Sequence, residues 1–204
     1  MSRGVARLLL LALLLGFALA GTASAAPESF TYDRELAIIA RETLWHALGD
    51  EPSIARRDVD RVSVRCYRSR EAFERTFERW FEGSARHVVA YYAGGRDVHL
   101  RKVTCANARL FLRGRHTLFT SAAFSILLHE SLHRQGVRGE RVTTCFANDA
   151  VRWGALWYGF GDARAIRARN LAFEYTRRYS PDSYFMGRPT CLALARKQSW
   201  PDFR

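Results

Sequence analysis

The chain has 204 residues, of which 32 are Lys or Arg and 20 are Asp or Glu, which gives a formal net charge of +12. This length is sufficient for one domain with a substantial core. The basic residues are almost all arginines and are scattered through every segment, without a basic stripe interleaved with aromatic residues. The composition therefore disfavours specific nucleic-acid recognition and leaves anionic cell-envelope polymers or lipids as weak electrostatic partners.

The N-terminus has the pattern of a secretory signal peptide over residues 1–25. Two arginines precede an apolar run at residues 8–20, and residues 23–25 form the small-residue cleavage pattern A-S-A. We expect cleavage after Ala25, which leaves residues 26–204 as a single exported domain; the alternative is an uncleaved anchor. No other segment is long and apolar enough to cross a bilayer, so the mature chain is expected to be secreted or extracytoplasmic and monomeric.

Helix and strand periodicities alternate in the first part of the exported segment. Residues 32–48 repeat apolar positions at helical spacing, and residues 59–67 alternate as a strand does. Ser69 can cap a second helix that extends to Phe81. The aromatic residues at helical spacing in this second helix are expected in the core: Phe73, Phe77 and Trp80.

A β-hairpin is predicted next, because residues 87–92 and 96–100 have strand character on either side of Gly94-Gly95. A strand of such a hairpin can offer a free edge to which an extended peptide adds as a further strand. His99 lies in the second strand of the hairpin. A surface position is favoured for His99, and a role as an active-site donor is the alternative.

The second part of the chain is predicted to be mainly helical. Residues 121–128 are nearly all apolar and contain no Pro or Gly, which indicates a buried helix that begins near Thr120 or Ser121. Gly136 is expected to end this helix, because glycine is the usual residue at a left-handed helix stop. Further helices are predicted over residues 105–112, 142–158 and 163–179, the last of which ends before Pro181.

The end of the buried helix carries the sequence H-E-x-x-H, formed by His129, Glu130 and His133. Histidines four residues apart lie on one face of a helix, so both imidazoles can reach one zinc ion. Glu130 would then stand beside the metal, where its carboxylate can take the proton of a zinc-activated water that attacks a peptide carbonyl. The alternative is a buried helix whose histidines only form hydrogen bonds, although this leaves the charge of Glu130 without a partner.

Catalytic zinc sites usually have three protein ligands and one open position. Glu140 is the predicted third ligand, because it follows His133 by seven residues, just beyond the turn at Gly136. The alternative for Glu140 is an acidic residue that the dipole favours at a helix N-terminus. Asp149 and Glu174 are the reserve ligands.

The four cysteines of the chain are Cys66, Cys105, Cys145 and Cys191. An even number of cysteines in an exported chain predicts two disulfides. Three pairings are possible, and we favour Cys66–Cys105 with Cys145–Cys191, because each bond then joins segments within one half of the chain. A cysteine metal site is disfavoured, because the sequence contains no C-x-x-C pair.

The segment HESLHRQGVRGERVTTCFA, at residues 129–147, resembles the core of a family of secreted actinobacterial zinc metallopeptidases. The family pattern is approximately H-E-x-x-H-x-x-G-x-x-x-E, followed by a Cys and an Ala in the next helix. Thr144 stands where the family commonly has a second acid, which bears on activity more than on metal binding. A metzincin motif would require a histidine where this chain has Gly139.

Together these features predict an α+β, zincin-like domain that is mainly helical, with a small antiparallel sheet and an active-site helix carrying H-E-x-x-H. The expected function is a secreted zinc metallopeptidase that binds Zn²⁺ and cleaves peptide or protein substrates. Tyr184 and His99 are the candidates to stabilise the oxyanion. The alternatives are an inactive, disulfide-stabilised envelope scaffold with a structural zinc, and a cell-wall amidase that shares the metal chemistry.

Overall fold

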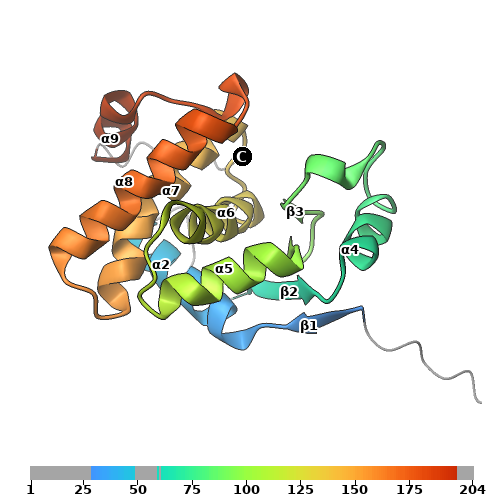
Figure 1. Ribbon diagram of the computed structural model, residues 1–204. Coiled ribbons are helices and arrows are strands. Elements are labelled where there is room, and N and C mark those ends of the chain that lie inside the picture. Colours follow the sequence, from blue (N-terminus) through green and yellow to red (C-terminus); the bar gives the residue numbers. More distant parts are fainter. Residues whose placement is uncertain (1–28, 49–58, 60, 197–204) are drawn as a thin grey trace, which may run out of the picture.

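The computed structural model of the protein describes residues 29–48, 59 and 61–196, and the signal peptide predicted over residues 1–25 lies outside them. Within the described residues, a group of packed helices lies beside a small sheet of four strands (Figure 1). This arrangement confirms the α+β class predicted from the sequence. None of the helices in these ranges is both long enough and apolar enough to span a membrane.

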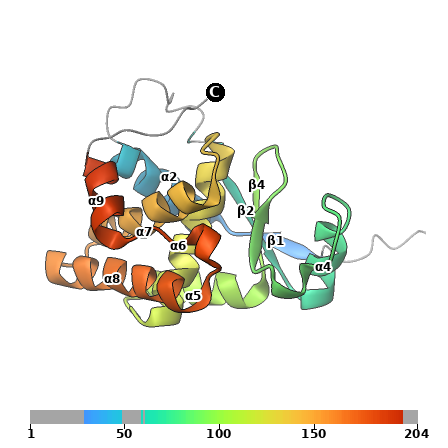
Figure 2. The same ribbon diagram turned by 90° about the horizontal axis from the view of Figure 1, so that it is seen from above.

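Most of the helices pack together on one side of the sheet, and α4 lies beyond it (Figure 2). The predicted helices are all present among the described residues, with ends that differ by a few positions. The helices are α2 (Arg34–Leu48), α4 (Arg70–Phe77), α5 (Lys102–Leu112), α6 (Leu118–Arg134), α7 (Glu140–Trp157), α8 (Asp162–Tyr179) and α9 (Arg188–Arg196), with short 3₁₀ turns at η1 (Ala85–His87) and η2 (Asp182–Tyr184).

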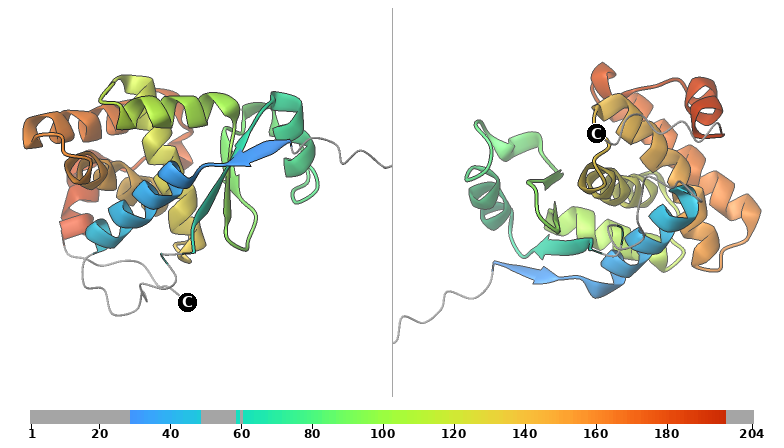
Figure 3. Two further views of the ribbon diagram at one scale, coloured as in Figure 1. Left: turned by 90° about the horizontal axis from the view of Figure 1, so that it is seen from below. Right: turned by 180° about the vertical axis from the view of Figure 1, so that it is seen from behind.

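The sheet has the strand order β1-β2-β4-β3, and its strands are β1 (Phe30–Tyr32), β2 (Ser63–Tyr67), β3 (Ala90–Tyr92) and β4 (Asp97–Leu100). The predicted hairpin is confirmed, because β3 and β4 pair in antiparallel fashion. However, β4 pairs in parallel with β2, so the prediction of an antiparallel sheet was wrong. The chain passes from β2 through α4 and η1 to the outer strand β3, and it then turns back between β3 and β2 as β4 (Figure 3).

Alternate residues of β4 face two different cores. Val98 and Leu100 belong to the main core, which the sheet shares with the helices around α6. His99 faces the other way, where its ring stacks on Tyr91 at 4.4 Å and its Nδ1 lies 2.9 Å from the hydroxyl oxygen of Tyr67. Only 5% of His99 is exposed, so the surface position favoured from the sequence was wrong.

The second core lies between the sheet and α4 and is built mainly from aromatic residues. Phe73 is fully buried there, and Phe77 is partly buried, as the helical spacing predicted. Trp80 is 62% exposed, so its predicted core position was wrong. Helix α4 ends at Phe77, and a helical repeat no longer fixes the direction of a side chain three residues beyond that end.

Helix α6 is buried along most of its length, which explains its apolar sequence. It begins at Leu118, slightly before the start predicted near Thr120 or Ser121, and Thr117 is its cap. The Thr117 side chain accepts the backbone N–H of Thr120, and the Thr120 side chain accepts the backbone N–H of Thr117. This capping box satisfies two donors at the helix start. The helix ends just before Gly136, as predicted.

Two disulfides connect the sheet and the helices. Cys66–Cys105 joins β2 to α5, and Cys145–Cys191 joins α7 to α9, which confirms the favoured pairing. Disulfides persist in oxidising compartments, so this pairing indicates that the chain folds outside the reducing cytosol.

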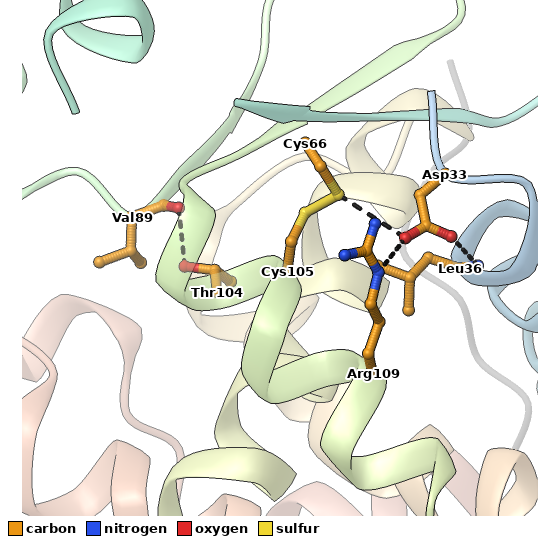
Figure 4. The surroundings of a disulfide bond; sticks show 7 residues. All are labelled: Asp33, Leu36, Cys66, Val89, Thr104, Cys105 and Arg109. Atoms are coloured by element: carbon orange, nitrogen blue, oxygen red, sulfur yellow. Dashed lines mark hydrogen bonds and ion pairs between the residues drawn. A yellow bond between two sulfur atoms is a disulfide. The ribbon is translucent and has the colours of Figure 1, made fainter. Parts of the chain in front are cut away.

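The first disulfide lies within a group of polar contacts that join α5 to the chain next to the two edge strands, β1 and β3 (Figure 4). Arg109 of α5 donates to Asp33 at 2.6 Å, and Asp33 accepts the backbone N–H of Leu36 at 2.9 Å, which caps α2. On the other side of α5, the hydroxyl of Thr104 donates to the carbonyl of Val89 at 3.1 Å. Helix α5 therefore holds the chain just before β3 in place.

Candidate metal centre

Two histidines of α6 lie one helical turn apart and converge at their outer nitrogens. The Nε2 atoms of His129 and His133 are 3.0 Å apart, and their rings are nearly perpendicular. His129 is buried and His133 is partly buried, so both imidazoles are largely withdrawn from solvent. The four-residue spacing thus produces the shared face that the sequence predicted.

The turn between α6 and α7 brings a carboxylate to this pair. Gly136 and Gly139 have φ angles of 88° and 91°, which residues with a side chain rarely adopt. This sharp turn makes Glu140 the first residue of α7 and directs it back towards α6. The carboxylate oxygens of Glu140 lie 2.9 Å from Nε2 of His129 and 3.4 Å from Nε2 of His133.

The donor set of this cluster suits a catalytic zinc ion. The ligand atoms of His129, His133 and Glu140 all lie within 4.8 Å of one another. Tetrahedral zinc with bonds of about 2.0–2.1 Å requires donor separations of about 3.3 Å. The separation of 3.0 Å between the two imidazole nitrogens is close to that requirement, while one oxygen of Glu140 lies 2.9 Å from His129 and the other lies 3.4 Å from His133. Two imidazoles and one carboxylate also match a known zinc set that keeps one position open.

The second nitrogen of each histidine has its own partner, which orients the ring. Nδ1 of His133 donates to the carbonyl of Val137 at 2.9 Å. Nδ1 of His129 lies 3.1 Å from the hydroxyl of Thr144. Such partners fix the tautomer and leave Nε2 for the metal. The sequence interpretation treated Thr144 only as a missing acid. Its position four residues after Glu140, on the same face of α7, was the signal for this role.

Contact between Glu140 and the histidines shifts the pKa values of Glu140 and His133. Hydrogen bonds to His129 and then His133 hold the pKa of Glu140 well below its usual range. Burial lowers the pKa of His133, but hydrogen bonds to Glu140 and to the Val137 carbonyl outweigh it, so the pKa is raised. In the absence of a cation, hydrogen bonds with the imidazoles stabilise this carboxylate. A divalent cation would take over that role.

Glu130 lies beside the cluster and not within it. Burial raises the pKa of the Glu130 carboxyl, and the nearby imidazoles and the backbone N–H of Tyr92 oppose this effect. The hydrogen bond from Tyr92 connects the outer strand β3 to α6 and was not foreseen from the sequence. Glu130 also lines a cleft of about 530 Å³ together with His129 and Tyr184. Its carboxylate therefore borders space in which a substrate can lie.

The structure places the two oxyanion candidates at different sites. The ring of Tyr184 stacks on that of His129 at 5.9 Å, and its hydroxyl interacts with Glu140. Burial and the charges of Glu140 and Glu130 raise the pKa of Tyr184 to about 12, so its hydroxyl keeps its proton at neutral pH. His99 lies on the opposite face of the sheet from α6 and does not line the cleft. Its alternative role as an active-site donor is therefore not supported.

The reserve ligands lie outside the cluster. Asp149 forms an ion pair with Arg169 at 3.5 Å, and Glu174 pairs with Arg177 and Arg178 on the surface of α8. Neither carboxylate belongs to the group of donors around His129. Among the three acidic candidates, the structure brings only Glu140 to the histidines.

Comparison with protein-family models, with curated proteins and with solved structures gives no match to this chain. The functional interpretation therefore depends on the geometry of the cluster and the cleft.

Proposed function

We propose that the protein is a secreted, zinc-dependent metallopeptidase. The observation that carries this proposal is the convergence of His129, His133 and Glu140 beside the carboxylate of Glu130, at one end of an open cleft. A purely structural cluster has no need of a general base beside it or of space for a substrate. When bound, zinc would supply the Lewis acid that polarises the scissile carbonyl and the attacking water.

The other residues of the site have complementary roles in this proposal. Glu130 takes the proton of the attacking water and later delivers it to the leaving amine. Tyr184 donates its hydroxyl proton to the oxyanion as negative charge develops there. Thr144 and Val137 orient the histidine rings.

The outer strand β3 offers a backbone to the substrate. The carbonyl of Val89 accepts the N–H of Arg101, so Val89 is bonded towards β4. Because such bonds alternate in an antiparallel pair, the backbone groups of Ala90 point away from β4. Ala90 also lines the cleft. An extended peptide can therefore pair with β3 at Ala90, next to the point where the N–H of Tyr92 bonds to Glu130.

The second candidate is an inactive envelope scaffold with a structural zinc. The observation that favours it is the hydrogen bond between Glu130 and the backbone of Tyr92, which gives this carboxylate a structural role. Metal content alone does not separate the two candidates, because both bind zinc. The separation depends on what the Glu130 carboxylate does in the presence of the metal.

Metal analysis combined with peptide hydrolysis tests the proposal. The purified protein should contain about one zinc per chain, and a chelator should abolish hydrolysis of a peptide library. Glu130→Gln should retain the zinc and lose turnover, whereas His133→Ala should lose both. Glu174→Gln, on the surface of α8, is the matched control and should change neither. A zinc-loaded wild-type protein without turnover would support the scaffold, and a protein that binds no zinc would contradict both candidates.

A further inference from the structure

The cleft continues from the metal cluster along α6 towards α8 and becomes apolar as it does so. Beyond His129 and Glu130, its walls are formed by residues of α6, α7 and α8, by the segment that leads into β3 and by the segment that follows α8. These residues carry aliphatic or aromatic groups: Val88, Val89, Ala122, Ile126, Tyr175 and Tyr179. The cleft therefore extends from His129 and Glu130 to an apolar region.

Few charged side chains line this cleft. The chain has 32 basic residues, yet within the part that the structure describes no Lys or Arg lines the cleft; Glu130 is its only carboxylate, and away from the metal cluster its only imidazole is that of His87. Away from the metal cluster, a wall without Lys or Arg offers no strong partner to an acidic side chain, and a wall without further carboxylates offers none to a basic one. The cleft is thus matched to an uncharged ligand.

The few polar groups on the floor of the cleft are already paired with one another. The Ser125 hydroxyl donates to the Asn148 carbonyl oxygen at 2.7 Å, and the Asn148 amide donates to the Thr176 hydroxyl at 3.1 Å. Thr176 in turn donates to the backbone carbonyl of Ala172 at 3.2 Å. Three of the polar side chains that line the cleft are therefore already hydrogen-bonded before a ligand binds.

Exposed aromatic rings lie where α8 and the start of α6 meet. Phe119 is 57% exposed and Tyr179 is 58% exposed, and their ring centroids are 6.4 Å apart. Tyr175 contacts both rings, at 6.1 and 5.1 Å, and lines the cleft with Tyr179. We call Phe119, Tyr175 and Tyr179 the aromatic cluster. Apolar groups exposed together beside a cleft mark a binding surface.

We propose that this cleft binds a neutral peptide segment and that the aromatic cluster holds a large apolar side chain of the substrate. The inference rests on the proposed peptidase function for the position of the scissile bond, but it concerns binding and can be tested without turnover. It names the substrate class as apolar, uncharged polypeptide, in contrast to the anionic polymers that the net charge alone would suggest.

Binding of labelled peptides to the full-length Glu130→Gln protein tests the proposal independently of catalysis. The probes are Ala-Gly hexapeptides that contain one Phe, Ala, Lys or Glu. Fluorescence anisotropy measures their binding. The Phe peptide should bind about tenfold or more tightly than the Ala peptide, because an aromatic side chain becomes buried. The Lys and Glu peptides should bind no better than the Ala peptide.

Variants of the aromatic cluster supply the residue-specific test. Phe119→Ala and Tyr179→Ala should each reduce the preference for Phe over Ala to about threefold or less, because less of the Phe side chain becomes buried. Tyr32→Ala is the matched control, because Tyr32 is 56% exposed on β1, outside the cleft, and its loss should leave the preference unchanged.

Three outcomes would overturn the proposal. The first is equal binding of charged and aromatic peptides, and the second is a Phe preference that survives the combined Phe119→Ala and Tyr179→Ala substitutions. The third is failure to bind any of the peptides, whether or not a tetramer of N-acetylglucosamine binds. This result would show that the cleft is not a peptide-binding site. Loss of zinc or of turnover in the wild-type protein would instead contradict the proposed function and leave these binding results to stand separately.

Discussion

Acid should destabilise the protein through His99, a buried histidine that has no part in the metal centre. Burial and then the charge of Arg65 lower the pKa of His99 to about 4, from 6.5 in the unfolded chain. Between these pH values the unfolded chain binds a proton at this position that the folded protein does not bind. The stabilising contribution is therefore fully present above about pH 6.5 and is lost as the pH falls towards 4.

The difference between the two pKa values sets the size of the effect. Each tenfold change in proton affinity corresponds to about 1.36 kcal/mol. The free energy of unfolding should therefore decrease by about 3 kcal/mol between pH 8 and pH 4 through His99 alone. This is a large part of the total stability of a typical domain.

Urea unfolding of metal-free protein at several pH values measures this contribution. Between pH 8 and pH 4 the free energy of unfolding should fall by about 3 kcal/mol more in the wild type than in His99→Gln. The other titrating groups are common to both proteins. Glutamine can still form a hydrogen bond with Tyr67, so the variant should fold. His46→Gln, at an exposed position on α2, is the matched control and should retain the wild-type dependence. Equal pH dependence of wild type and His99→Gln would refute the reasoning.

Three further predictions concern packing, the metal centre and the second disulfide. Gly154→Ala should lower the free energy of unfolding by at least about 1 kcal/mol, because the new Cβ would lie 2.4 Å from the buried ring of Phe124; thermal or urea unfolding measures it. Thr144→Val should weaken zinc binding about 10- to 100-fold in a competition titration. Replacing Cys145 and Cys191 by alanine should cost about 4 kcal/mol, given a loop of 46 residues, as measured by urea unfolding.

Matched variants separate these predictions from general disturbance. Gly161→Ala should carry no steric cost, because a Cβ at that position meets nothing within 4 Å and the backbone φ is negative; only the loss of a glycine N-cap on α8 remains. Thr144→Ser keeps the hydroxyl and should preserve zinc affinity. If Thr144→Val bound zinc as tightly as wild type, the hydroxyl would have no orienting role.

The sequence predicted the helices better than the sheet, for a physical reason. Apolar repeats at helical spacing and a cap such as Ser69 are local signals, and the hairpin at Gly94-Gly95 is local as well. The parallel pairing of β2 with β4 is a contact between strands about 30 residues apart in the chain, which no local pattern encodes. Strand β1, with three residues, was too short to be detected.

The same distinction applies to the candidate site. The shared face of His129 and His133 follows from helix geometry, and Glu140 lies close in sequence beyond the turn at Gly136. The environment of His99 could not be foreseen, because α4 and its aromatic residues cover that face of the sheet only in the folded protein. The role of Thr144 depended on how α7 packs on α6.

The two cross-links give the proposed enzyme a dependence on its surroundings. Cys145 directly follows Thr144, and Cys105 directly follows Thr104, which holds the entrance to β3. A reducing environment would thus loosen the contact between Thr144 and His129. It would also loosen the chain before β3, the strand with which a substrate would pair. We expect the newly made polypeptide to stay latent in the cell that produces it, and to mature only after export has allowed its thiols to oxidise.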